Sequence, residues 1–203
     1  MSTSAARISK LAVQNGPIYF WRETDAQTGW LSQWWPCAFR DDKGVVYKTA
    51  EHYMMHHKAM LFNDPAMADA ILKAGHPRKV KSMGRKVKNF DPAVWDAERE
   101  RIVREGSYFK FTRAVSEDGL RLGASSTAPF IGKTLRELLL STHPRELVEA
   151  SPFDAIWGIG LVAKDADPNH RDAWGLNLLG KALMDARERF VKEDEEKERE
   201  QKE

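Results

Sequence analysis

Residues 49–62, with the sequence TAEHYMMHHKAMLF, place two opposite charges on the apolar side of an amphipathic helix. At about 100° per residue, one narrow stripe of this helix carries Glu51, Met55, Lys58 and Phe62. Helices normally turn charge toward solvent, because a buried acid or amine costs solvation energy unless it is paired or functional. Glu51 and Lys58 are therefore candidate catalytic residues, since local rules tend to be broken at functional sites.

A structural explanation of the same two charges stays open. Thr49 can cap the helix, and a carboxylate at Glu51 suits the positive end of the helix dipole. Lys58 can extend its amine to solvent along the helix surface. Under this explanation neither charge has a catalytic role.

Three histidines are expected on the outer, exposed face of this helix: His52, His56 and His57. His52 and His56 have the i,i+4 spacing of zinc ligands on a helix. However, the segment has no His-Glu-x-x-His motif, and no third ligand is evident. We therefore predict no metal site.

The composition is that of one ordinary globular domain, with 203 residues, 42% hydrophobic residues and a net charge of +2. No apolar run approaches the roughly 18 residues of a transmembrane helix, and the N-terminal segment lacks the apolar core of a secretory signal. The single cysteine, Cys37, excludes an internal disulfide and fits a reducing compartment. We expect a cytoplasmic protein without membrane association, and a nuclear location stays open.

Three segments are expected along the chain: a disordered segment at residues 1–16, one folded domain at 17–190 and a charged tail at 191–203. The domain begins with strands or extended segments between residues 18 and 47. These include a hairpin at the turn signal DDKG of residues 41–44.

The rest of the domain is expected to be mainly helical, because several capping signals precede apolar runs. Helix starts are predicted at residues 63–65, 91–92, 133 and 151–154, and the last helix at 177–190. Residues 119–132 form an irregular insertion rich in Gly, Ser and Ala. The tail either prolongs the last helix through i,i+4 charge pairs or frays. The fold class is thus mainly α (α+β), with a small β element near the N-terminus.

Several sequence blocks, taken together and in order, resemble one known family. The blocks are WLSQW at 30–34, YKTAEHY at 47–53, MGR at 83–85, WD at 95–96, KF at 110–111, LVEASPFD at 147–154, WGIG at 157–160 and WGLNLLGKALM at 174–184. The chain resembles the NADAR (NAD- and ADP-ribose-associated) family, also called YbiA-like, over roughly residues 18–190. Each block is weak alone, and their co-occurrence makes the resemblance specific.

The resemblance implies an N-glycosidase, which cuts the bond between a ribose anomeric carbon and a nitrogen, without a cofactor. Some members of the family act on phosphorylated ribosylamino-pyrimidines of riboflavin biosynthesis, and others remove ADP-ribose from guanine in nucleic acid. It implies catalytic residues at Glu51, Lys58 and Asp154. The implied substrate-binding residues are Trp30, Ser32, Arg85, Trp95, Trp157, Gly158, Gly160 and Asn177.

The chain also departs from the family pattern. Residues 31–34 read LSQW where relatives usually read Leu-Ser-Asn-Phe, and Arg113-Ala114 replaces the usual Gln-Asn after the KF block. Thr142-His143 stands where a Thr-Gly is usual, and the insertion at 119–132 is extra. These departures bear on the substrate more than on the reaction.

Two mechanisms stay open. In the first, desolvation keeps Lys58 partly neutral, so that it attacks the anomeric carbon and forms a Schiff base that water hydrolyses. Glu51 then shuttles protons and orients the sugar hydroxyls. In the second, Lys58 acts only electrostatically, and Glu51 or Asp154 activates water directly.

Two further groups of residues are assigned to the substrate. Trp157 can stack on the base while Asp154 holds ribose hydroxyls, although Asp154 can also be a simple helix cap and Trp157 a core residue. Gly158 and Gly160 allow backbone amides to approach a ligand, or simply make a turn. The basic run at 76–88, which includes Arg85, suits phosphate, although such a run is usually a solvated helix face.

Our first hypothesis is an N-glycosidase that releases ADP-ribose from modified guanine, with ADP-ribosylated DNA or RNA as its partner and no obligate protein partner. The second keeps the reaction and takes a ribosylamino-pyrimidine 5′-phosphate. The third is a non-catalytic module that binds NAD or ADP-ribose. The basic run and the insertion favour the large nucleic-acid substrate.

Overall fold

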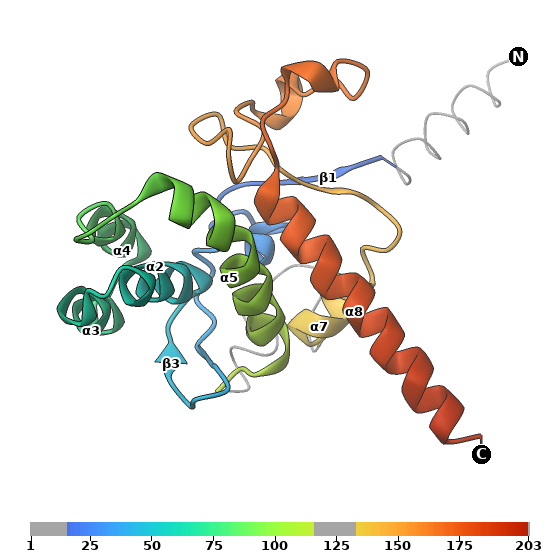
Figure 1. The fold of residues 1–203 in the computed structure, drawn as a ribbon. Coiled ribbons are helices and arrows are strands. Elements are labelled where there is room, and N and C mark those ends of the chain that lie inside the picture. The colour runs from blue at the N-terminus through green and yellow to red at the C-terminus, as the bar shows by residue number, and fades with distance from the viewer. Residues whose placement is uncertain (1–15, 116–132, 203) are drawn as a thin grey trace, which may run out of the picture.

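The structure is a computed structural model that describes residues 16–115 and 133–202 (Figure 1). The expected disordered segment, apart from residue 16, and the whole of the expected insertion lie outside the described residues. The described part is mainly helical with small sheets, which confirms the predicted α+β class. None of the described helices is long and apolar enough to cross a membrane.

Capping residues define where the first four described helices begin. Thr49 caps α2 (Ala50–Leu61), and Asp64 caps α3 (Pro65–Lys73). His76 caps α4 (Pro77–Gly84), and Asp91 caps α5 (Pro92–Thr112). Each capping side chain accepts a hydrogen bond from a backbone N–H of the first turn, and proline follows the cap in α3, α4 and α5. The helix starts predicted near residues 63–65 and 91–92 are thereby confirmed.

Two helices follow the undescribed segment. Thr134 and Glu137 form a reciprocal capping box at the start of α7 (Leu135–Leu140). The last helix, α8, spans Leu178–Glu200 and therefore carries residues 191–200 of the expected charged tail as continuous helix. Ion pairs such as Arg199 with Glu195 have the i,i+4 spacing that supports such a helix.

The strands form two separate pairs. β1 (Ile18–Phe20) runs parallel to β4 (Leu147–Glu149), with Ile18 beside Leu147. β2 (Phe39–Arg40) and β3 (Val46–Tyr47) are antiparallel, which confirms the hairpin predicted at residues 41–44. Asp41 holds this turn, because its Oδ1 accepts from the backbone N–H groups of Lys43 and Val45 at 2.9 Å.

Helix α2 lies at the centre of the core. It packs against α3, α4 and α5, and α5 in turn packs against α8 (Figure 1). Within residues 16–115 and 133–202, three short 3₁₀ helices lie in the connecting segments: η1 (Gly29–Leu31), η2 (Ala163–Asp165) and η3 (Arg171–Ala173). The C-terminal ends of β1 and β4 lie side by side, so the segments that follow them border the same region of the molecule.

The expectation of an exposed histidine face on α2 is wrong. His52 has 0% exposure, and its ring nitrogens lie 2.8 Å from Thr49 Oγ1 and 3.1 Å from the carbonyl oxygen of Ala74. His56 and His57 are half-buried, and both rings contact the Tyr47 ring of β3. α3 and the β2–β3 hairpin cover this face, which single-helix periodicity does not reveal.

The helix start predicted at residues 151–154 is also wrong, since residues 151–162 form turns. Backbone carbonyl groups of this loop, which would accept hydrogen bonds within a helix, instead accept them from residues 176 and 177. The Ala155 carbonyl accepts from Leu176 N at 2.8 Å, and the Gly158 carbonyl accepts from Asn177 N at 3.1 Å. These long-range hydrogen bonds hold the loop open as a wall of the site described below.

Candidate functional site

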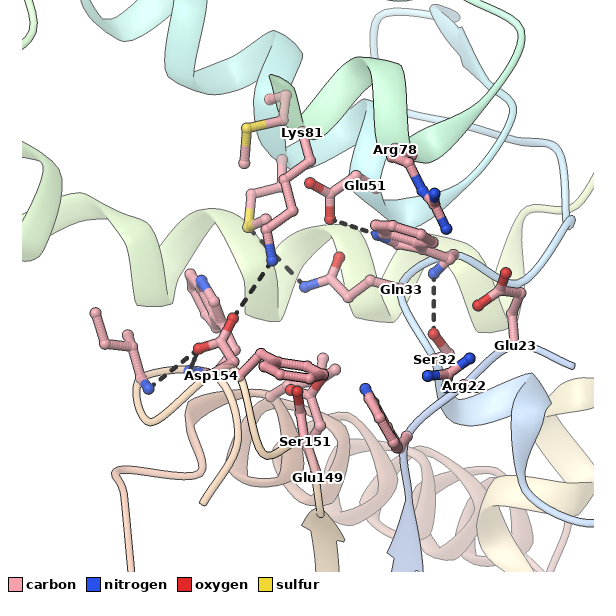
Figure 2. A pocket seen from close by; sticks show the side chains of 18 of the residues that line it. Arg22, Glu23, Ser32, Gln33, Glu51, Arg78, Lys81, Glu149, Ser151 and Asp154 are labelled. Atoms are coloured by element: carbon pink, nitrogen blue, oxygen red, sulfur yellow. Dashed lines mark hydrogen bonds and ion pairs between the residues drawn. The ribbon is translucent and has the colours of Figure 1, made fainter. Parts of the chain in front are cut away.

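A pocket of about 780 Å³ opens between α2, α4, the segment after β1 and the loop after β4 (Figure 2). This volume lies in the usual range for ligand sites. Its walls combine aromatic rings, cations and carboxylates. The lining residues are Trp21, Arg22, Glu23, Thr24, Ser32, Gln33, Trp34, Glu51, Met54, Met55, Arg78, Lys81, Ser82, Arg85, Glu149, Ser151, Phe153, Asp154, Ile156, Trp157 and Leu179.

Glu51 is a buried acid of this pocket. It lies in the first turn of α2 and is only 3% exposed. Its Oε2 accepts a hydrogen bond from Trp34 Nε1 at 3.3 Å, while its Oε1 is buried without a hydrogen-bond partner among the described residues. Burial raises the pKa of Glu51 to about 7, against the opposing effects of Lys81 and of the Trp34 hydrogen bond. A carboxyl group in this state can exchange a proton near neutral pH.

Glu149 is a second acid of the same pocket, a half-buried residue at the C-terminal end of β4. Its Oε2 is buried and accepts no hydrogen bond within the described part of the chain. Burial raises the pKa of Glu149 to about 8, and the Asp154 and Glu51 carboxylates act in the same direction. The sequence interpretation missed Glu149 as a site residue, although it lies in the LVEASPFD block. An acid ending an otherwise apolar three-residue strand is a signal that could have found it.

Helix α4 contributes cations along one face. Arg78, Lys81 and Arg85 line the pocket, at spacings that bring them to the same side of the helix and of its C-cap. The helix sits close to α2, since a Cβ at Gly84 would lie 1.9 Å from Met55 Sδ. This close approach lets the cations of α4 face the acid of α2.

The loop after β4 is ordered by Asp154. Its Oδ1 accepts from the backbone N–H groups of Ile156 at 3.1 Å and Trp157 at 2.8 Å, and its Oδ2 lies 3.5 Å from Lys81 Nζ (Figure 2). Asp154 and Trp157 both line the pocket, so the structure brings these two predicted residues together. Asp154 is also the cap that the alternative explanation described, although it caps a turn instead of a helix.

Three predicted binding residues build the scaffold behind the pocket instead of lining it. A Cβ at Gly158 would lie 2.5 Å from the Glu149 carbonyl oxygen, and Gly160 has a φ of +72°. The Asn177 side chain accepts from Glu149 N at 3.0 Å and donates to the Leu147 carbonyl at 2.9 Å. These residues hold β4 and its loop in place and so position Glu149.

Two tryptophans that were predicted to bind substrate also lie outside the pocket lining. Trp30 is buried in the core against Phe111, and its Nε1 donates to the Gln27 carbonyl. Trp95 is buried, and its ring lies next to Lys58 Nζ. Ser32 and Arg85, by contrast, line the pocket as expected. Ser32 Oγ accepts from Trp34 N at 3.2 Å and so helps to place the Trp34 ring.

Lys58 is not among the described residues that line the pocket. Its Nζ lies 4.0 Å from the centre of the Phe90 ring and 5.2 Å from that of Trp95. It is separated from Glu51 by two helical turns, or about 10 Å along α2. Met55, covered by Gly84, lies between them on the stripe. The pocket lining therefore includes Glu51 and not Lys58, and the lysine among its lining residues is Lys81.

Comparisons with known proteins agree with the motif blocks. The model of the NADAR domain matches residues 19–191. The chain is 39% identical over 163 residues to N-glycosidase R617 of Acanthamoeba polyphaga mimivirus, a match covering 78% of this chain and 85% of that protein. It is 27% identical over 176 residues to riboflavin biosynthesis protein VVA0006 of Vibrio vulnificus, covering 87% of this chain and 39% of that longer protein.

The fold is similar to a solved structure as well. The NMR structure of the Escherichia coli protein YbiA aligns with a TM-score of 0.64 and 26% identity, covering 89% of this chain and 88% of that one. The family model and the fold comparison point to the same class of protein. The chain belongs to the NADAR family and is an N-glycosidase, a hydrolase that acts on N-glycosyl compounds.

Proposed function

We propose that this hydrolase releases ADP-ribose from ADP-ribosylated guanine in nucleic acid. The observation that carries the proposal is the pair of buried carboxyl groups, Glu51 and Glu149, inside a pocket that also offers aromatic rings and a row of cations. Glycoside hydrolysis commonly uses two carboxyl groups in different protonation states. Because the chain is a hydrolase, the hypothesis of a non-catalytic module is set aside.

The two acids have different roles in proton transfer. With pKa values raised to about 7 and about 8, and with the Glu51 carboxylate disfavouring ionisation of Glu149, the pair holds about one proton near neutral pH. Glu51, hydrogen-bonded by Trp34, is the ionised member and takes a proton from the attacking water. Glu149, with the higher pKa, is the protonated member and donates its proton to the leaving nitrogen.

The step is balanced without a cofactor. The water oxygen bonds to the ribose anomeric carbon as the carbon–nitrogen bond breaks, and the departing guanine nitrogen gains the proton from Glu149. Glu51 ends protonated and Glu149 ionised, and proton exchange with solvent resets the pair. This is the direct-water mechanism, which the position of Lys58 outside the pocket lining favours over the covalent one.

The cations and aromatic rings of the pocket can bind the phosphates and the purine of the proposed ADP-ribosyl substrate. Arg78 and Arg85 are exposed at the pocket and can bind the two phosphates of ADP-ribose bidentately. Lys81 is tied to Asp154 and keeps the loop after β4 near α4. Trp34 and Trp157 are half-buried in the wall and offer flat surfaces to a purine.

A second candidate substrate has a specific observation in its favour. The chain is similar to riboflavin biosynthesis protein VVA0006 over 176 residues, which favours a phosphorylated ribosylamino-pyrimidine. Such a substrate carries one phosphate and one small ring, so it would use less of the pocket than ADP-ribosyl guanine.

A direct comparison of the two substrates tests the proposal. The enzyme is incubated with an ADP-ribosylated guanine oligonucleotide or with the ribosylamino-pyrimidine 5′-phosphate, and free sugar products are followed by chromatography. We expect ADP-ribose release by the wild type and its loss in Glu51→Gln. Arg40→Gln, an exposed cation outside the pocket lining, is the matched control. Turnover of the pyrimidine alone would replace the proposed substrate with the second candidate.

A further inference from the structure

The apolar ring of Phe153 is far more exposed to solvent than apolar rings in folded proteins normally are. It is 85% exposed, more than any other exposed large hydrophobic residue of the described chain, yet it borders the pocket. Its ring centre lies 5.9 Å from that of Trp21, with an interplanar angle of 53°. The Arg22 guanidinium lies 4.4 Å above the Trp21 ring. Two aromatic rings and a cation therefore meet at the rim of the pocket.

Backbone hydrogen bonds fix the positions of the two segments that carry Trp21 and Phe153. Trp21 directly follows β1, and Phe153 belongs to the loop that follows β4, the parallel neighbour of β1. Ala150 N donates to the Phe20 carbonyl at 2.8 Å, which joins the two segments where they leave the strands. Gly160 N donates to the Asp154 carbonyl at 3.1 Å and closes the loop just after Phe153. The exposure of Phe153 is thus a property of an ordered loop.

Aromatic rings with nearby arginine are the usual means by which proteins hold single-stranded nucleic acid. Every base has a flat face that stacks on such a ring, and the cations follow the phosphates. Here Arg22 lies beside the rings, and Lys79 is a further exposed cation, adjacent in sequence to the pocket residue Arg78. Glu23 is the acid next to Arg22 on the same segment (Figure 2).

We propose that Phe153, Trp21 and Arg22 form a stacking platform for a base that neighbours the modified guanine in a single strand. The inference rests on the proposed function and names its substrate more closely. A guanine that enters the pocket has to leave its stack, and a ring at the rim replaces part of the stacking that its neighbour loses. Trp34 and Trp157 are half-buried in the pocket wall and can stack on the purine of ADP-ribose. The exposed rings at the rim therefore remain free to stack on a base of the strand.

The test compares a short and a long substrate. ADP-ribosylated guanosine lacks neighbouring bases, whereas a single-stranded oligodeoxynucleotide with one ADP-ribosylated guanine has them. We expect Phe153→Ala to raise KM for the oligonucleotide about 5- to 150-fold, the range of one lost base stack, and to leave KM for the nucleoside unchanged. Phe153→Tyr keeps the ring and should retain wild-type KM. Met60→Ala, an exposed apolar residue of α2 outside the pocket lining, is the control.

Two outcomes would overturn the platform. If Phe153→Ala weakens both substrates equally, Phe153 contacts ADP-ribose itself; if it weakens neither, the ring takes no part in binding.

Binding of an unmodified, fluorescein-labelled single strand separates this inference from the proposed function. A wild type that cleaves neither substrate but binds the strand more tightly than Phe153→Ala would refute the function and leave the platform. Cleavage of both substrates with no difference between the variants in cleavage or binding would refute the platform and leave the function.

Discussion

Lys110 and Glu51 are both buried ionisable side chains, and their hydrogen bonding differs. Lys110 of α5 is 2% exposed, and its Nζ donates to the carbonyl oxygens of Trp30 at 2.7 Å and Ser32 at 2.8 Å. Glu51 is equally buried, but one of its oxygens has no partner among the residues described. Burying a charge is tolerable when hydrogen bonds satisfy it and costly when they do not. The contrast is between a hydrogen-bonded buried amine and a buried carboxyl group with an unpartnered oxygen.

The two charges are also connected. The Ser32 carbonyl that Lys110 holds belongs to the segment that carries Gln33 and Trp34 into the pocket, where Trp34 donates to Glu51. Gln33 also accepts from Glu51 N at 3.0 Å through its carbonyl oxygen. Lys110 thus holds the segment from which Trp34 donates to Glu51.

The largest expected effect is on the rate when Glu51 loses its ability to ionise. Glu51→Gln keeps the shape of the side chain and should lower kcat about 100- to 10,000-fold, because a positioned general base typically contributes that much. Circular dichroism and the melting temperature check that the fold persists. Glu105→Gln removes an acid of α5 outside this pocket and serves as the control. A variant with wild-type kcat would show that Glu51 is only a helix-terminal charge.

The same substitution should change how stability depends on pH. The folded-state pKa of about 7 lies above the unfolded value, so the folded protein binds more protons between pH 4.5 and 7. The free energy of unfolding therefore falls as pH rises through this window, by up to about 3 kcal/mol. In Glu51→Gln this fall should become smaller in urea titrations at pH 5 and pH 7.

The next effect concerns the second acid. If Glu51 acts ionised and Glu149 acts protonated, kcat/KM rises through about pH 7 and declines above about pH 8. Glu149→Gln should lower the rate about 100-fold and remove the decline at high pH, since no proton remains to be lost. An unchanged alkaline decline in this variant would assign it to another group.

Substitution of Lys110 is expected to lower the free energy of unfolding and to have a smaller effect on the chemical step. Lys110→Met leaves the Trp30 and Ser32 carbonyls buried without a donor, which should cost about 2–4 kcal/mol of unfolding free energy. Because the Ser32 segment loosens, we also expect KM to rise more than kcat falls. Denaturant titration at pH 8 measures the first effect. Unchanged stability would contradict the distinction between the two buried charges.

The helices were predictable where a local signal and the tertiary structure agree. Asp64 and Asp91 cap the helices that the sequence places there, and Asp41 holds the predicted hairpin turn. Asp154 gives the same local signal and caps two N–H groups, yet no helix follows, because residues 176 and 177 take the carbonyls of the loop. A capping motif reports the first turn only, and distant partners decide whether the chain continues as helix.

The site was predictable in part for a similar reason. Periodicity identifies the face of α2 that is buried, and it finds Glu51 correctly as a pocket residue. It does not show how far along that face the pocket extends, which depends on where α4 crosses and Gly84 meets Met55. Glu149 lies on a strand of three residues, too short for its alternation to be read from the sequence.

The smallest expected effect falls on Lys58, at the other end of the same stripe. Burial lowers the pKa of this amine, a property that the covalent mechanism requires, yet its neighbours are the Phe90 and Trp95 rings. Lys58→Met keeps the apolar stem and should leave kcat within about twofold, with a loss of about 1 kcal/mol in stability from the missing cation–π contact. Borohydride added during turnover should trap no sugar adduct on Lys58. An adduct there would mean that the pocket reorganises around the substrate, and an adduct on Lys81 would keep the covalent route but move it to the lysine that already faces the pocket.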